Sequence, residues 1–327
     1  MSLFTLRTQK MLWGRAAGRC SMMDCRIELV EDATETDNEA LVGENCHIVA
    51  DSEDGPRGKD PLPFDQRAKY GNLILLCRNH HRVIDQQVNT YTVEALNKIK
   101  SDHESWVKST LQIFDEAKQR DDEWYATVVD DWVRRCHLDE WQRWTSWLVG
   151  GGPPQIWVDI EADLDELRAW LLNRFWPERY ADLEAALSNF RRVLSDLHGT
   201  FRRHAIREED VWITEAFYKK IWHRDPKTYD RLLNQYEAHE DLLTDLTFEL
   251  TRAANLVLQI VRERMSPSFR EAEGKCMVQR GPEEDFSYRT YLPTYSAEQR
   301  LEGQLYPGAK KFSAVLKSRD FFFGKAD

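Results

Sequence analysis

The stretch Asn72-Leu73-Ile74-Leu75-Leu76-Cys77-Arg78-Asn79-His80-His81 decides the fold of the N-terminal region. Its first half is a short apolar run after Gly71, which is typical of a buried β-strand. Its second half places one thiol and two imidazoles directly after that strand. We expect a helix over residues 80–88. The stretch therefore predicts a strand that delivers metal-binding side chains to the start of a helix.

Four residues match the spacing of a tetrahedral zinc site. Cys20 and Cys25 are separated by four residues, and Cys77 and His80 by two. Zinc prefers thiolate and imidazole, and two close pairs of ligands are typical of a structural zinc that holds a small domain together. Clustered cysteines in an intracellular chain also favour a metal site over disulfides. We therefore predict structural Zn²⁺ bound by Cys20, Cys25, Cys77 and His80.

The segment between the two ligand pairs is longer than in an ordinary zinc finger, so we expect it to contain further functional residues. His47 lies in a strand expected over residues 45–50, and Asn72 begins the next strand. His81 directly follows the last predicted zinc ligand. A histidine, an asparagine and a histidine thus occur in the order strand, strand and helix around the predicted zinc.

This arrangement resembles the HNH endonucleases of the ββα-metal fold. The residues that carry the resemblance are Cys20, Cys25, Cys46-His47-Ile48, Gly55-Pro56-Arg57-Gly58, the stretch from Asn72 to Cys77, His80-His81 and Ile84-Asp85. The run Asn89-Thr90-Tyr91-Thr92-Val93-Glu94 also resembles the end of this module in HNH effector nucleases of bacterial anti-phage defence. The resemblance covers about residues 5–110. It implies a metal-dependent endonuclease that hydrolyses phosphodiester bonds of double-stranded DNA, as a regulated effector in anti-phage defence.

The resemblance also assigns catalytic roles to three residues. It makes His47 the general base, and a neutral imidazole suits the deprotonation of water near neutral pH. His81 matches the histidine that holds the catalytic divalent metal, which implies Mg²⁺ or Mn²⁺ as a second cofactor. Asn72 matches the residue that fixes the loop carrying the base.

Two positions depart from the family pattern. Many HNH enzymes have Asp or His immediately before the base as a second metal ligand, whereas this chain has Cys46, and a thiol is a poor ligand for Mg²⁺. Asp85, one helical turn after His81, is a candidate replacement, and a structural aspartate is an equal alternative. The fourth zinc ligand is His80 where many relatives have Cys, and zinc accepts either.

The rest of the chain differs in composition from this region. Only Trp13 and Trp106 precede residue 117, and the other ten tryptophans follow it. Apolar residues recur there at helical spacing, and the segment Gly150-Gly151-Gly152-Pro153-Pro154 indicates a linker. We expect an α+β protein with an HNH nuclease domain over residues 1–115, a helical connector over 116–150, and an α-helical sensor or partner-binding domain over 151–327.

The net charge of −11 excludes a protein that coats nucleic acid by bulk positive charge. No apolar run approaches the roughly 20 residues that span a bilayer, so we expect a cytoplasmic protein without a membrane partner. Expected partners are double-stranded DNA and either further copies of the chain or a defence-system protein. An alternative function is a catalytically inactive, zinc-stapled module for DNA binding or assembly, and RNA is an alternative substrate.

Overall fold

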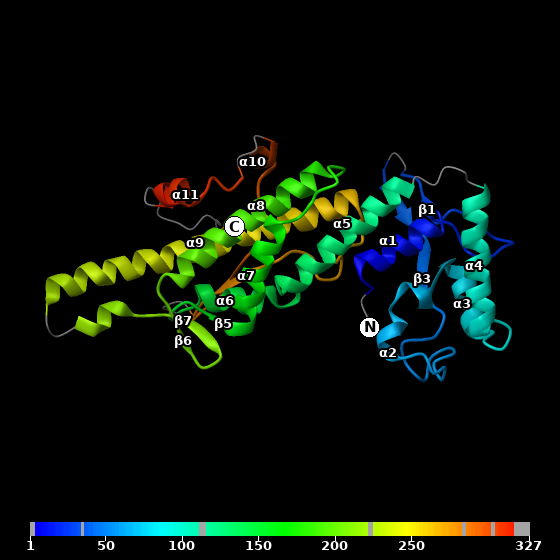
Figure 1. The fold of residues 1–327 in the computed structure, drawn as a ribbon, viewed down its shortest axis with the longest axis horizontal. Coiled ribbons are helices and arrows are strands. Elements are labelled where there is room, and N and C mark those ends of the chain that lie inside the picture. Colours follow the sequence, from blue (N-terminus) through cyan, green and yellow to red (C-terminus); the bar gives the residue numbers. More distant parts are fainter. Residues whose placement is uncertain are drawn as a thin grey trace. The chain divides into compact units, whose positions relative to one another are not determined.

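The computed structural model describes residues 4–33, 36–110, 116–221, 225–282, 286–301 and 305–316. Helices dominate, and the strands pair in small antiparallel sheets, so the predicted α+β class is confirmed (Figure 1). The chain divides into two compact units, Met1–Asp130 and Asp131–Asp327, and the division falls within helix α5 (Glu116–Arg135). The predicted domain boundary at residue 115 lies outside the described residues. Residues 150–154, which we expected to form a linker, lie inside the second unit.

The first unit combines short strands with helices (Figure 1). Besides the start of α5, its elements are α1 (Leu6–Arg15), β1 (Val30–Glu31), β2 (Ala40–Leu41), β3 (Gly43–His47), α2 (Phe64–Arg67), the 3-10 helix η1 (Tyr70–Asn72), β4 (Leu73–Cys77), α3 (Arg78–Gln86) and α4 (Val93–Thr110). Strand β1 pairs with β2, and β3 pairs with β4. The strand and helix expected around residues 72–88 are thus confirmed as β4 and α3.

Strand β4 forms the centre of this unit. All its residues are buried, because α1 and α3 both pack against it and β3 pairs along its length. The antiparallel register runs from Gly43 opposite Cys77 to His47 opposite Leu73. His47 therefore lies beside the start of β4, whereas Cys77 and the first turn of α3 lie at the opposite end of the strand pair.

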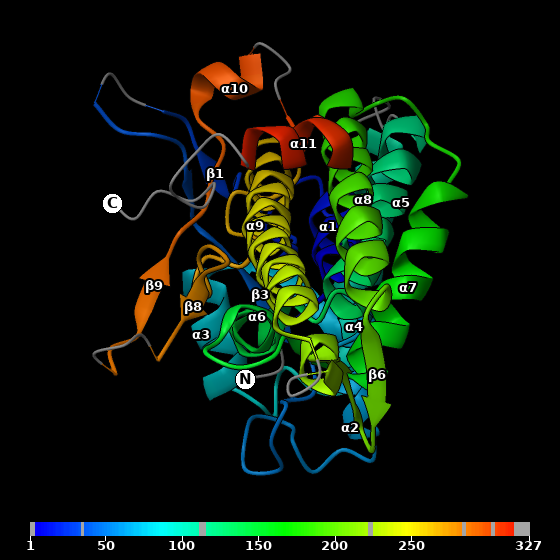
Figure 2. The same ribbon diagram turned by 90° about the vertical axis from the view of Figure 1, so that its left-hand side faces the viewer.

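The second unit is mainly helical (Figures 1 and 2). It contains the end of α5, the 3-10 helix η2 (Leu138–Glu140), α6 (Trp141–Val149), β5 (Gln155–Trp157), α7 (Val158–Leu172), α8 (Ala181–Arg202), β6 (Ala205–Glu208), β7 (Val211–Thr214), the 3-10 helix η3 (Phe217–Ile221), α9 (Pro226–Arg264), β8 (Val278–Arg280), β9 (Arg289–Tyr291), α10 (Ala297–Leu301) and α11 (Ala309–Leu316). Helices α8 and α9 lie side by side and α7 packs against α8. The sheet of this unit has the strand order β5, β7, β6, and β8 pairs with β9.

Local sequence signals account for the ends of these helices. The Asp225 side chain accepts hydrogen bonds from the backbone N–H groups of Lys227 and Thr228, and Pro226 occupies the first turn of α9, which are both typical of a helix start. Between α5 and α6 the helical pattern is interrupted at His137, whose φ of +50° is left-handed. Within the described residues, none of the helices has both the length and the apolar composition needed to cross a membrane.

Candidate functional site

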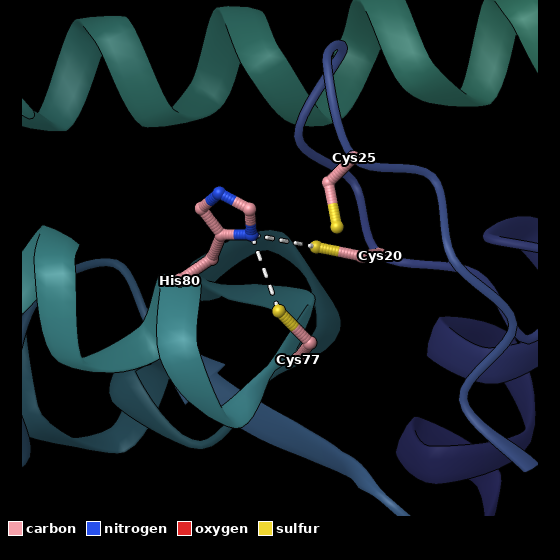
Figure 3. A group of neighbouring side chains, drawn as sticks. All are labelled: Cys20, Cys25, Cys77 and His80. Atoms are coloured by element: carbon pink, nitrogen blue, oxygen red, sulfur yellow. Dashed lines mark hydrogen bonds between the residues drawn. The ribbon is translucent and has the colours of Figure 1, made fainter.

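Three cysteines and one histidine come together where β4 meets α3 (Figure 3). Cys77 ends β4 and His80 lies in the first turn of α3, while Cys20 and Cys25 lie between α1 and β1. His80 Nδ1 lies 3.2 Å from Cys77 Sγ and 3.6 Å from Cys20 Sγ. The four ligand atoms all lie within 4.8 Å of one another. The Cys/His cluster could therefore hold a metal ion such as zinc.

Backbone hydrogen bonds close the cysteine-bearing loop and hold it against β4. Ser21 N donates to Leu75 O of β4 at 2.9 Å, and Cys20 N donates to Ile27 O at 3.0 Å. Burial raises the pKa of the Cys20 thiol to about 12, so a thiolate at this position needs a cation beside it. Zn²⁺ is such a cation, and three thiols with one imidazole are a donor set that it prefers.

Asn72 is buried and fixes the chain immediately after His47. Its Oδ1 accepts from Val49 N, and its Nδ2 donates to Val49 O and to Arg67 O, each at 2.9 Å. The backbone adds a hydrogen bond from Ile48 N to Asn72 O at 2.8 Å. These contacts join the end of β3 to the turn before β4, so the position of His47 depends on the Asn72 side chain.

His47 is half-buried at the end of β3. Its ring lies against Phe4, with 5.0 Å between the ring centroids. Burial lowers the pKa of His47 below its ordinary range, and the nearby His81 lowers it further, whereas Asp51 and Asp85 act in the opposite direction. In the described part of the chain, His47 Nε2 is buried and has no hydrogen-bond partner. A neutral imidazole with a free ring nitrogen can accept a proton.

His81 does not join the Cys/His cluster and instead lies between two carboxylates. Its Nδ1 lies 2.5 Å from Glu44 Oε2 of β3, and its Nε2 lies 3.3 Å from Asp85 Oδ2, one turn along α3. The hydrogen bond with Asp85 raises the pKa of His81. Burial alone would raise the pKa of Asp85, but hydrogen bonds from His81 and Arg57 outweigh it, and the pKa is lowered.

Arg57 connects the end of β3 to α3, beside His81 and Asp85. Its guanidinium is buried and donates to Ile48 O at 2.5 Å, to Ile84 O at 2.6 Å and to Asp85 Oδ1 at 2.8 Å. The tight loop around it requires glycine at position 58, because a Cβ there would lie 2.1 Å from a backbone carbonyl oxygen. Arg57 thus holds Asp85 at a fixed distance from the end of β3.

Two residues that contact His81 or Asp85 were assigned no role from the sequence, namely Glu44 and Arg57. The signal for Glu44 was strand alternation, since Glu44 and Cys46 lie on the same face of β3. Cys46 itself is fully buried, and its thiol donates to Glu44 O at 3.3 Å. Burial also raises the pKa of that thiol, so Cys46 offers no ligand for a hard cation.

Comparison with protein-family models and with curated proteins finds no match for this chain. The chemistry of the site therefore has to be inferred from its own residues. Those residues form two groups on one strand–helix unit: the sulfur-rich Cys/His cluster, and an oxygen- and nitrogen-rich group that we call the polar site, formed by Glu44, His47, His81 and Asp85.

Proposed function

We propose that the protein is a metal-dependent DNA endonuclease of the HNH type, in which β3, β4 and α3 form the ββα-metal module. The observation that carries the proposal is the buried Nε2 of His47, which has no hydrogen-bond partner in the described chain. Buried polar atoms are almost always paired in native proteins, and an exception calls for a ligand or a catalytic role. A water that attacks a phosphodiester would complete this pairing.

In the proposed reaction His47 is the general base. Its Nε2 takes a proton from the attacking water, and the lowered pKa keeps the ring neutral, and therefore competent, at neutral pH. Asn72 and Arg57 act on the same step indirectly. Both bind the backbone of residues 48–49, so they hold His47 in place while the proton moves.

His81 and Asp85 are the residues that would hold a divalent metal ion. An imidazole nitrogen with a carboxylate oxygen suits Mg²⁺ or Mn²⁺, whereas the buried Cys46 does not. When bound, such an ion supplies Lewis-acid stabilisation of the leaving 3′ oxygen. We assign zinc to the Cys/His cluster, with a structural role, because its four protein ligands leave no open coordination position.

The proposal extends to the biological role. A nuclease with net charge −11 gains little phosphate attraction from its bulk charge. We therefore infer a cytoplasmic, regulated effector of anti-phage defence that binds double-stranded DNA weakly as a single chain and acts as a homo-oligomer or with a partner protein. Residues 151–327 would then serve as the sensor or partner-binding part.

The direct test is cleavage of supercoiled plasmid DNA by the full chain with Mg²⁺ or Mn²⁺. Wild type should convert the plasmid to nicked and linear forms, and His47→Ala should lose about two to four orders of magnitude in rate. Gln86→Ala, an exposed change on α3, should cleave like wild type. Unfolding curves and zinc content should be the same for all three proteins.

The outcomes separate the proposed functions. Equal cleavage by wild type and His47→Ala would exclude His47 as the base. If both proteins bind DNA but neither cleaves it, with or without candidate activators, the inactive DNA-binding or assembly module becomes the better assignment. The same assay on RNA tests the alternative substrate. If His47-dependent cleavage occurs with RNA but not with plasmid DNA, the protein is an RNA nuclease.

A further inference from the structure

His81 contacts two carboxylates that come from different elements and differ in distance. Glu44 Oε2, on β3, lies 2.5 Å from Nδ1, whereas Asp85 Oδ2, on α3, lies 3.3 Å from Nε2. The two carboxylates therefore occupy opposite nitrogens of one ring. A single metal ion can bind only one of these nitrogens, so the two sides must have different roles.

The two distances indicate which ring nitrogen of His81 can bind a metal ion and which one is held by a hydrogen bond. Two ligand atoms in neighbouring octahedral positions, each about 2.1 Å from Mg²⁺, are separated by about 3.0 Å. The Nε2 and Asp85 pair is slightly wider than this separation, so it can close onto an ion. The Nδ1 and Glu44 pair is already shorter than this separation and has the length of a strong charge-assisted hydrogen bond.

The positions of the neighbouring groups agree with this division. Asp85, on the Nε2 side, is one of the charges that raise the pKa of His47 against the effect of burial. Arg57 binds the other oxygen of Asp85 at 2.8 Å, which leaves Oδ2 directed at His81. Glu44 lies opposite Leu76 in the strand register, next to the residue after which α3 begins, so its side chain can reach His81 from β3.

We propose that Glu44 is a positioning residue for a divalent-metal site at His81 Nε2 and Asp85. Glu44 accepts a hydrogen bond from Nδ1–H of His81, which fixes the ring orientation and keeps the hydrogen on Nδ1 when a metal ion replaces the one on Nε2. Carboxylate–histidine pairs of this kind orient metal-binding histidines in many proteins. Glu44 thus fixes the ring of His81 from β3. The buried Cys46, on the same strand, offers no metal ligand. This inference rests on the proposed function.

The test measures Mn²⁺ binding to the zinc-loaded full chain without DNA, by electron paramagnetic resonance titration. Glu44→Ala should weaken Mn²⁺ binding by about tenfold to a hundredfold. Glu44→Gln should lose less, because its amide oxygen still accepts from Nδ1–H. Asp85→Asn should weaken binding at least as much as Glu44→Ala. Glu39→Ala, an exposed change in the same unit, should bind Mn²⁺ like wild type.

A second measurement separates positioning from a general structural effect. Nitrogen-15 NMR of the histidine rings with saturating Mg²⁺ should show Nδ1–H on His81 in wild type and in Glu44→Gln, and a mixture of tautomers in Glu44→Ala. Zinc content and unfolding midpoint should stay unchanged in each variant. Unchanged Mn²⁺ affinity and tautomer in Glu44→Ala would overturn the proposal, and so would absence of Mn²⁺ binding by wild type.

The outcome is independent of the nuclease assay. If Mn²⁺ binding depends on Glu44 and Asp85 but no nucleic acid is cleaved, the metal site stands and the proposed function fails. If plasmid DNA is cleaved in a His47-dependent way while Glu44→Ala binds Mn²⁺ like wild type, the proposed function stands and the role of Glu44 fails.

Discussion

His80 and His81 are neighbours on α3, yet they belong to chemically different surroundings. His80 faces three thiols in the Cys/His cluster, whereas His81 lies between the carboxylates of Glu44 and Asp85. Sulfur and nitrogen donors favour zinc, and oxygen-rich groups favour Mg²⁺ or Mn²⁺. One strand–helix junction can therefore present two sites with different metal preferences, because consecutive residues of a helix point about 100° apart.

Removing a thiol from the Cys/His cluster should have the largest effect. We expect Cys77→Ala to lose zinc and to unfold the first unit, because structural zinc contributes about 10 kcal/mol or more in small zinc domains. That contribution is comparable to the whole stability of a domain. The measurements are zinc content by mass spectrometry and unfolding followed by circular dichroism.

The matched control is Cys136→Ala, which removes a buried thiol from the second unit, outside the cluster. It should keep the zinc content of wild type. Unchanged zinc in Cys77→Ala would contradict the assignment of the cluster.

Exchanging either histidine for cysteine should distinguish the two sites most sharply. His80→Cys should retain zinc and cleavage, because zinc accepts a fourth thiolate. His81→Cys should retain zinc but lose about a hundredfold or more of Mg²⁺-dependent plasmid cleavage, since Mg²⁺ binds thiols poorly. The opposite pattern, with cleavage lost in His80→Cys and kept in His81→Cys, would mean that the two roles are reversed.

Changing Asn72 tests the frame that holds His47, without touching either metal-binding group. Asn72→Asp keeps an acceptor for Val49 N but replaces the donor to Val49 O and Arg67 O with a carboxylate oxygen. We expect a loss of about 2–3 kcal/mol in the free energy of unfolding, because two buried carbonyls lose their partner. Urea denaturation measures it.

Asn79→Ala, an exposed change on α3, serves as the control and should alter that free energy by less than about 0.5 kcal/mol. Equal stability of Asn72→Asp and wild type would show that the loop after His47 does not depend on this side chain.

The smallest expected effect concerns the pH dependence of cleavage. His47 must be neutral to act as a base, and burial lowers its pKa from the ordinary 6.5, so wild-type activity should persist below that pH. Phe4→Ala uncovers the ring, raises its pKa and should move the acid limb of the rate profile upward by roughly a few tenths of a pH unit. Initial rates measured from roughly pH 5 to pH 8 test this. An acid limb that moves downward in Phe4→Ala would contradict the role of burial.

Individual strands and helices were easier to predict than the arrangement of the polar site. The apolar run over 73–77 and the helix after it follow from local pattern, as does the start of α9 at Asp225-Pro226. The interruption between α5 and α6 escaped prediction because it depends on a left-handed His137. Apolar periodicity does not report the backbone conformation of a single non-glycine residue.

By itself, the sequence determined which side chains are available: three cysteines and a histidine at zinc-like spacing, and the order His47, Asn72, His81. Spacing along a strand or helix fixes such neighbours, because those elements have regular periods. Only the tertiary structure decided that Glu44 belongs to the polar site, that Arg57 binds Asp85 there, and that the Cys46 thiol is buried. Those facts depend on the β3–β4 register and on a loop that carries Arg57 back to α3, and long-range contacts of this kind leave no period in the sequence.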